Sequence, residues 1–312
     1  MSESGTGRKR RLFPNTPDTE LYYPATDHER VLGRLQQAIA DSEGLMLLAG
    51  EPGTGKTLLC HCLLERLGPD VCCAFLTNSH FPNAAGLLQA LLYEFSMPYE
   101  ERGEQELRLA LTDFLLKNYS QNRQTILIID ESQNLMPEHL EELRLLGNLE
   151  ARGGKAVQIL LSGQMSALEC ISRPEADAFR QRLATRLILD RLSLEEAADY
   201  LHHHVRAAGA QLGELFTEEA LALLARGTKG IPRLLNQAAH QSLQLAEEAE
   251  SMPVDAEAAL EALSGLDLEA PEYESPEDLP ALSVDGTDQL AANNAEGPAG
   301  KASLLGRFSV LS

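Results

Sequence analysis

A glycine-rich stretch at residues 50–57 has the residue types and spacing of a loop that wraps around a phosphate group. It reads Gly-Glu-Pro-Gly-Thr-Gly-Lys-Thr and fits the pattern G-x-x-x-x-G-K-S/T in full. Glycines let the backbone turn its N–H groups toward a phosphate, and the N-terminus of a following helix adds partial positive charge. Lys56 is expected to reach the terminal phosphates and the Thr57 hydroxyl to bind magnesium. The predicted nucleotide-binding residues are Gly50, Glu51, Pro52, Gly53, Thr54, Gly55, Lys56, Thr57 and Leu58.

An acidic pair, Asp130 and Glu131, follows directly on the apolar run at 126–129. Because burying an unpaired charge is costly, these carboxylates need a partner. We expect Asp130 to bind magnesium together with Thr57, and Glu131 to orient or deprotonate the attacking water. The pair therefore predicts ATP hydrolysis with Mg²⁺ as cofactor, in which Glu131 and Lys56 are catalytic.

Other polar side chains are candidates for contact with the γ-phosphate. Ser162 or Gln164, at the end of a predicted strand, lies where a side chain would sense that phosphate; a polar turn is the alternative. Arg180, Arg182 and Arg186 are candidates for an arginine donated by a neighbouring subunit, a contribution worth on the order of 10³ to 10⁵ in rate. We select Arg182; the alternative for this basic cluster is a solvated helix face.

Arg233 follows a Gly-Ile-Pro segment at residues 230–232 and begins a predicted helix. From that place it would contact the nucleotide and report its state to a second domain. The three consecutive histidines at 202–204 face different directions on a helix, so we expect exposed helix residues there and no metal site.

The elements that must position these residues alternate between strand and helix. Short apolar runs at 45–49, 71–76, 125–129 and 157–161 predict buried strands, and amphipathic or apolar segments between them predict helices. This alternation predicts an α/β fold with a mainly parallel sheet and a ligand site at the carboxyl ends of the strands. Helices are predicted at 27–40, 84–95, 104–119 and 135–150, and from 56 onward.

Beyond residue 192 the strand signal stops, and four helices are predicted between 194 and 263. The chain is therefore divided into a flexible N-terminal segment (1–20), a P-loop core (21–192), a helical lid (193–264) and a disordered acidic tail (265–312). The tail ends in an apolar peptide at 304–311, for which a docking element and a frayed terminus remain alternatives.

The net charge of −21 is concentrated near the C-terminus, because residues 234–300 contain fifteen Asp or Glu and no Lys or Arg. Such a chain repels nucleic acid, and the basic run at 8–11 is the main electrostatic handle for it. Apolar runs fall short of the ~18 residues that a membrane span requires, and no apolar core of a secretory signal follows the basic run. These features predict a cytoplasmic protein without a membrane span, for which DNA is a less favoured partner.

With these motifs the sequence resembles bacterial AAA+ ATPases of the general secretion pathway, the ExeA type, which are related to transposition helper ATPases of the TniB type. The resemblance covers residues 12–263 and includes Ile-Asp-Glu-Ser-Gln-Asn-Leu at 129–135, Phe-Arg-Gln-Arg-Leu at 179–183 and Gly-Ile-Pro-Arg-Leu-Leu-Asn at 230–236. It implies a RecA-like core with a C-terminal helical lid, ATP-dependent homo-oligomers and arginines contributed across subunits. Ser132 stands where the family usually has Ala, and Met165 where Pro is common. The acidic tail replaces the membrane span and periplasmic region of secretion members, which puts the pathway in doubt.

Three hypotheses follow for the whole protein. The first is an ATPase that assembles with a partner in a secretion, pilus or cell-envelope complex. The second is a DNA-linked AAA+ regulator, which the acidic charge disfavours. The third is a nucleotide-dependent scaffold with negligible turnover, which Glu131 and the arginine cluster disfavour.

Overall fold

A parallel sheet with helices on both faces forms the larger part of the computed structural model, which describes residues 12–151 and 154–269. Within these residues, five strands pair in the order β2-β3-β6-β1-β7, and every neighbouring pair is parallel. Parallel neighbours need a crossover connection, and helices supply it here. The strands are β1 (Leu45–Gly50), β2 (Cys72–Leu76), β3 (Thr125–Ile129), β6 (Gln158–Gly163) and β7 (Leu183–Leu189). A small antiparallel pair, β4 (Glu150–Ala151) and β5 (Gly154–Lys155), lies between β3 and β6 in the chain.

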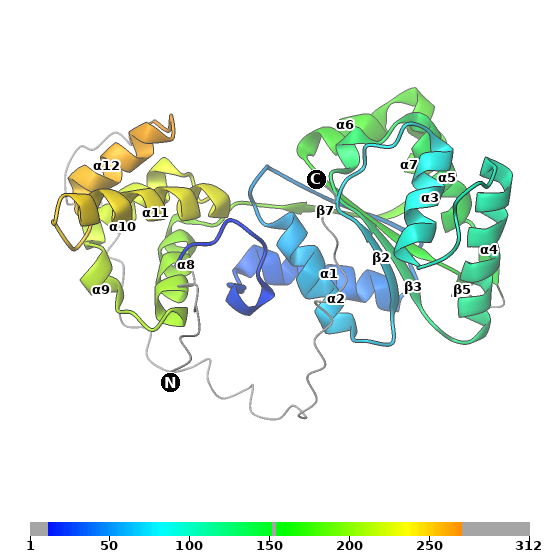
Figure 1. Ribbon diagram of the computed structural model, residues 1–312, viewed down its shortest axis with the longest axis horizontal. Helices are drawn as coiled ribbons and strands as arrows, with labels where there is room; N and C mark the ends of the chain where they lie inside the picture. Colours follow the sequence, from blue (N-terminus) through cyan, green and yellow to red (C-terminus); the bar gives the residue numbers. More distant parts are fainter. Residues whose placement is uncertain (1–11, 152–153, 270–312) are drawn as a thin grey trace, which may run out of the picture.

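Alternation along the strands divides the core into two apolar layers, one on each face of the sheet. Helices cover both faces (Figure 1). Successive side chains point to opposite faces, so Leu45 and Leu47 of β1 pack on one layer and Met46 and Leu48 on the other. The first layer is covered by α3 (Ala84–Glu94), α4 (Glu104–Ser120), α5 (Pro137–Gly147), α6 (Met165–Ser172) and α7 (Asp177–Arg180). The second is covered by α1 (Thr26–Ala40) and α2 (Lys56–Leu67). Short 3₁₀ turns lie at η1 (Thr19–Leu21), η2 (Ser132–Asn134) and η3 (Pro174–Ala176).

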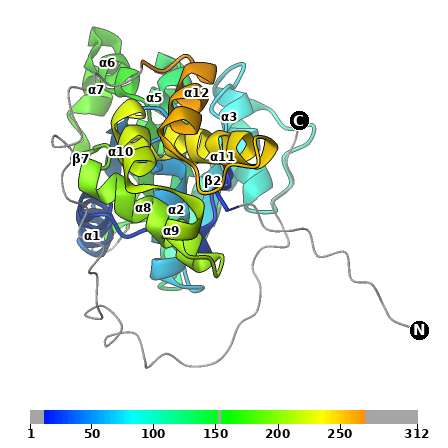
Figure 2. The same ribbon diagram turned by 90° about the vertical axis from the view of Figure 1, so that its left-hand side faces the viewer.

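The chain after β7 folds into helices only, which form a lid beside the core and face the viewer in Figure 2. They are α8 (Leu194–Ala207), α9 (Leu212–Leu215), α10 (Glu218–Gly227), α11 (Pro232–Glu248) and α12 (Ala256–Gly265). Side chains of Ser193, Thr217 and Asp255 each accept a hydrogen bond from a backbone N–H in the first turn of the helix that follows. These caps explain where α8, α10 and α12 begin.

The N-terminal segment departs from the expected flexibility. Phe13 is only 1% exposed and packs in the apolar core of the lid, with its ring centroid 6.1 Å from that of Phe216. Asn236 Nδ2 donates to the Pro14 carbonyl at 2.8 Å. The buried Phe13 ring and the hydrogen bond to Asn236 tie this segment to the lid, so residues 12–20 are part of the folded structure. The basic run at 8–11, the remainder of the tail from 270 and its apolar peptide lie outside the described residues.

Strand β7 was not predicted, and it corrects the interpretation of the basic cluster as a helix face. Buried and exposed residues alternate along it, as expected for a strand at the edge of a sheet. Arg186 therefore lies on a strand and Arg180 at the end of a four-residue helix. Among the described residues, no helix has both the length and the apolar character to cross a bilayer.

Candidate nucleotide-binding site

The P-loop connects the end of β1 to the start of α2. Gly53 and Gly55 have φ angles of 84° and 102°, a backbone region that L side chains rarely adopt. A Cβ added at Gly50 would lie 2.8 Å from the Leu189 carbonyl, so the loop also passes too close to β7 for a side chain. Glu51 and Thr54 serve the loop itself, because the Glu51 carboxylate pairs with Arg191 at 2.6 Å and the Thr54 hydroxyl donates to the Glu51 carbonyl at 2.9 Å.

Lys56 lies inside the loop with its ammonium group held by backbone oxygens. Its Nζ donates to the carbonyls of Gly50 at 3.0 Å and Glu51 at 2.8 Å, and the side chain is 8% exposed. Burial lowers the pKa of Lys56, while Asp130 and Glu131 oppose the shift. The Lys56 ammonium group is thus held at the place where the loop would bind a phosphate.

Thr57 and Asp130 meet as the sequence predicts for a magnesium site. The Thr57 hydroxyl donates to Asp130 Oδ2 at 2.5 Å, and the Ser162 hydroxyl donates to Oδ1 at 2.7 Å. Hydroxyl and carboxylate oxygens are the hard donors that Mg²⁺ prefers, so the residues present fit the metal. Ser162 is fully buried behind Asp130. Of the two candidate sensors, Ser162 orients Asp130, and Gln164 lines the pocket.

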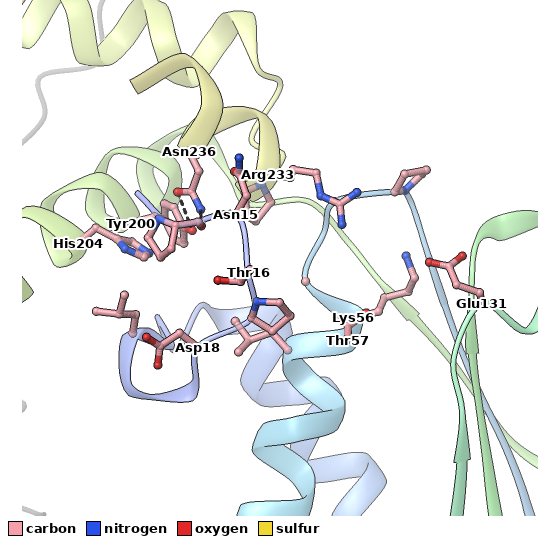
Figure 3. A pocket seen from close by; sticks show the side chains of 18 of the residues that line it. Asn15, Thr16, Asp18, Lys56, Thr57, Glu131, Tyr200, His204, Arg233 and Asn236 are labelled. Carbon is pink, nitrogen blue, oxygen red and sulfur yellow. Dashed lines mark hydrogen bonds between the residues drawn. The ribbon is translucent and has the colours of Figure 1, made fainter. Parts of the chain in front are cut away.

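The pocket itself is bounded by three parts of the chain: the P-loop, the N-terminal segment and the lid (Figure 3). Glu131 and Lys56 lie at one end, and Tyr200, His204 and Asn236 at the other. Its further lining residues are Pro14, Asn15, Thr16, Pro17, Asp18, Leu21, Pro52, Gly53, Gly55, Thr57, Leu58, Gln164, Pro232 and Arg233. Cationic and acidic groups at one end and largely uncharged walls at the other suit a phosphate chain joined to a base.

His204 corrects the expectation that residues 202–204 are exposed. It is 3% exposed, its ring lies 4.4 Å from that of Tyr200, and Phe13 packs against it. Burial, reinforced by the neighbouring His203, lowers its pKa to about 4. The N-terminal segment causes this burial, and the local helical pattern carries no sign of it.

Arg233 is brought to the P-loop by the start of α11. Its backbone N–H donates to the Gly53 carbonyl at 3.2 Å, and its side chain lines the pocket. Figure 3 shows the guanidinium group above the loop, on the same side as the Lys56 ammonium. The lid and the phosphate-binding loop are therefore in direct contact.

Arg182 lies away from this pocket. It precedes Leu183, which pairs with Leu45 at the start of β1, whereas the P-loop begins at the other end of that strand. Five residues of strand separate these points by about 16 Å. Its backbone N–H donates to the Phe179 carbonyl at 2.9 Å, but within the described residues its guanidinium has no hydrogen bond, whereas that of Arg180 forms an ion pair with Asp177. It is thus exposed and remote from the P-loop of its own chain.

His28, which belongs to none of the sequence motifs, supports the loop from α1. It is 5% exposed, and its Nε2 lies 2.9 Å from the Thr54 carbonyl. Because a carbonyl only accepts, Nε2 carries the proton, and burial lowers the pKa of the ring. The sequence does carry a sign of this burial, because His28 precedes the apolar residues Val31 and Leu32 by three and four positions and therefore shares their helix face.

Comparisons with known proteins agree with this geometry. Residues 39–171 match the model of the family described as AAA domain. Over 225 residues the chain is 34% identical to general secretion pathway protein A of Aeromonas hydrophila, a match that covers 72% of this chain. The chain spans only 41% of the length of that relative.

Solved structures show the same fold at low sequence identity. The ORC2 protein of Aeropyrum pernix has a TM-score of 0.63 at 19% identity, over 83% of this chain and 72% of that one. Cdc6p from Pyrobaculum aerophilum has a TM-score of 0.62 at 17% identity, over 78% and 70%. The RuvB Holliday junction branch migration motor of Thermotoga maritima has a TM-score of 0.53 at 19% identity, over 83% and 74%. The predicted α/β P-loop core with a C-terminal helical lid is confirmed.

Proposed function

Because the chain is an AAA+ protein of the ExeA type, we propose that it binds ATP with Mg²⁺ and hydrolyses it to ADP and phosphate. The observation that carries this proposal is the 2.5 Å contact between the Thr57 hydroxyl and Asp130, at the mouth of a loop that encloses Lys56. Two residues 73 positions apart meet there with the donor atoms that a magnesium-bound phosphate requires.

Each residue has a separate task in this reaction. Backbone N–H groups of the loop and Lys56 bind the β- and γ-phosphates, and Thr57 and Asp130 hold the metal, which neutralises phosphate charge when bound. Glu131 accepts a proton from the attacking water as the new P–O bond forms at the γ-phosphorus. The bond from that phosphorus to the bridging oxygen breaks, and ADP leaves.

We propose that the protein acts as an ATP-dependent homo-oligomer in which Arg182 completes the site of a neighbouring subunit. Support comes from its exposure and from the ~16 Å of strand between it and the P-loop of its own chain. Arg233, at the lid, would bind the γ-phosphate of its own chain and transmit nucleotide state to α11.

The process that turnover serves is proposed from the relative alone. General secretion pathway protein A is named for secretion, so we propose a cytoplasmic ATPase that assembles with a protein partner in a secretion, pilus or cell-envelope complex. The overall acidic charge favours a protein partner over DNA.

The test measures Mg²⁺-dependent ATP turnover over a range of protein concentrations, with and without duplex DNA. We expect Lys56→Ala and Glu131→Gln to reduce turnover, the latter by roughly 10² to 10⁴. Arg182→Ala is expected to reduce it by on the order of 10³ or more. Arg34→Ala, an exposed arginine on α1, is the matched control and should retain turnover.

A mixing experiment tests the trans arrangement directly. Arg182→Ala and Glu131→Gln are each inactive alone, but a mixed oligomer contains sites with an intact Glu131 beside a neighbour with an intact Arg182. Turnover should therefore reappear on mixing. If mixing restores no turnover, Arg182 does not act across subunits. In the turnover assay itself, nucleotide binding without hydrolysis by the wild type would favour the scaffold hypothesis. A requirement for duplex DNA would favour the DNA-linked hypothesis.

A further inference from the structure

One side-chain amide, that of Gln133, connects Glu131, the proposed general base, to the end of a neighbouring strand. Its Nε2 donates to Glu131 Oε2 at 2.5 Å, and its Oε1 accepts from the backbone N–H of Gln164 at 3.0 Å. Gln133 lies in η2, directly after the acidic pair, and Gln164 lies between β6 and α6. The two ends of one amide thus join the general base to a residue that lines the nucleotide pocket.

The backbone of Glu131 is fixed independently of this contact. The residue has a φ of 54°, its carbonyl accepts from the Ser79 hydroxyl at 2.5 Å, and its N–H donates to Asp130 Oδ1 at 3.0 Å. Its carboxylate, by contrast, receives a hydrogen bond from Gln133 and from no other side chain of the described residues. The position of the carboxylate oxygens therefore depends on Gln133.

The surroundings keep the Gln133 amide in one place. A Cβ added at Gly163 would lie 2.9 Å from Gln133 Oε1 and 2.5 Å from the Ser132 hydroxyl, so only glycine lets the amide approach β6 this closely. The Cys170 thiol contacts the Gln133 backbone carbonyl at 3.6 Å and leaves the amide untouched. Gln133 is half-buried, and these contacts hold its amide against the end of β6.

We propose that Gln133 is a positioning residue, which sets the Glu131 carboxylate against the attacking water and moves it when the β6–α6 turn shifts. The inference rests on the proposed ATPase function. A γ-phosphate contacted by Gln164 would alter that turn, and the Gln164 N–H would pass the change through one amide to Glu131. Loss of the phosphate after hydrolysis would release the carboxylate in the same way.

The first test separates turnover from binding. Gln133→Ala should lower kcat by about 10- to 100-fold, the loss expected for a misplacement near 1 Å, and leave KM for ATP within about twofold. Cys170→Ala, which removes a contact to the Gln133 backbone only, is the matched control and should retain kcat. Thermal unfolding of each variant establishes that it is folded.

A second comparison isolates the Gln164 N–H. Gln164 has a φ of −73°, which proline adopts, so Gln164→Pro removes the N–H that faces Gln133, whereas Gln164→Ala retains it. Both variants lose the Gln164 side chain, so we expect kcat of Gln164→Pro to be lower than that of Gln164→Ala by about the factor that Gln133→Ala costs the wild type.

The decisive measurement places Gln133→Ala in the Glu131→Gln background, using single-turnover hydrolysis of labelled ATP. If Gln133 acts through Glu131, the double variant is no slower than Glu131→Gln alone. An additive loss, or a folded Gln133→Ala with wild-type kcat, overturns the proposal while the ATPase function stands. Wild-type protein that binds ATP and never hydrolyses it overturns both.

Discussion

Substitution of Gly53 by alanine tests whether contact between the lid and the P-loop is needed for nucleotide binding. Gly53 has a φ of 84°, where a side chain costs about 1–2 kcal/mol. The new Cβ would lie 2.9 Å from Arg233 Cβ and 3.1 Å from Ile231 Cγ2. Because carbon atoms pack at about 3.5–4.0 Å, the start of α11 must retreat by roughly 0.6 Å or more. The 3.2 Å hydrogen bond from Arg233 N–H to the Gly53 carbonyl would then be broken.

Gly68 provides the matched control for this substitution. It ends α2 with a φ of 83° and a ψ of 178°, and a Cβ there meets nothing within 4 Å. Gly68→Ala should therefore lose about 1–3 kcal/mol of stability from backbone strain alone and keep its affinity for nucleotide. Gly53→Ala should weaken nucleotide binding at least tenfold, about 1.4 kcal/mol, as measured by titration with a non-hydrolysable ATP analogue. Equal affinity in the two variants would refute the reasoning.

Three further predictions concern stability. Burial lowers the pKa of His204 to about 4, so the folded state favours the neutral ring, and stability falls as pH decreases from about 6.5 toward 4. The free energy of unfolding, measured by chemical denaturation, should be about 2 kcal/mol lower at pH 5 than at pH 7 because of His204, and His204→Gln should remove this part of the difference. If the free energy of unfolding of that variant depends on pH as the wild type does, the prediction is wrong. Arg108 forms an ion pair at 2.8 Å with Glu142, whose side chain is 3% exposed. Arg108→Met leaves that carboxylate unpaired and should lower the free energy of unfolding by about 3–5 kcal/mol, whereas the double variant Arg108→Met/Glu142→Met should lose much less. Urea unfolding in a double-mutant cycle measures both. Additive losses would argue against the ion pair. Phe13→Ala should destabilise the lid by about 3–5 kcal/mol, measured by hydrogen exchange of α8, and normal protection there would show that the segment is dispensable.

Local sequence patterns predict the features that depend on consecutive residues. The P-loop and strands β1, β3 and β6 are contiguous glycine-rich or apolar stretches, so their position could be predicted. The contact between Thr57 and Asp130 could also be predicted from the sequence, because parallel strands place their carboxyl ends at one edge of a sheet. The roles of Arg182 and Arg233 stay predictions.

Features that depend on distant partners could not be predicted in this way. Strand β7 is an edge strand whose exposed positions include Arg186, so its apolar signal is diluted. His204 is buried because Phe13 packs against it, a contact between residues that are far apart in the sequence. The Glu131 carboxylate accepts a hydrogen bond from Gln133, and hydrogen bonds between neighbouring polar side chains leave no periodic signal in a sequence.

The bond between Asn236 and the Pro14 carbonyl joins residues 222 positions apart, which has a consequence for synthesis. A ribosome adding about 5–20 residues per second delivers Asn236 roughly 10–45 s after Pro14. During that interval the strands of the core can pair, but Phe13 has no lid to enter and its ring faces water. Phe13 and Pro14 thus wait for partners that are synthesised much later than they are. One wall of the nucleotide pocket is complete only after Asn236 has left the ribosome, so a shorter nascent chain should bind nucleotide poorly and expose the Phe13 ring as an aromatic chaperone target.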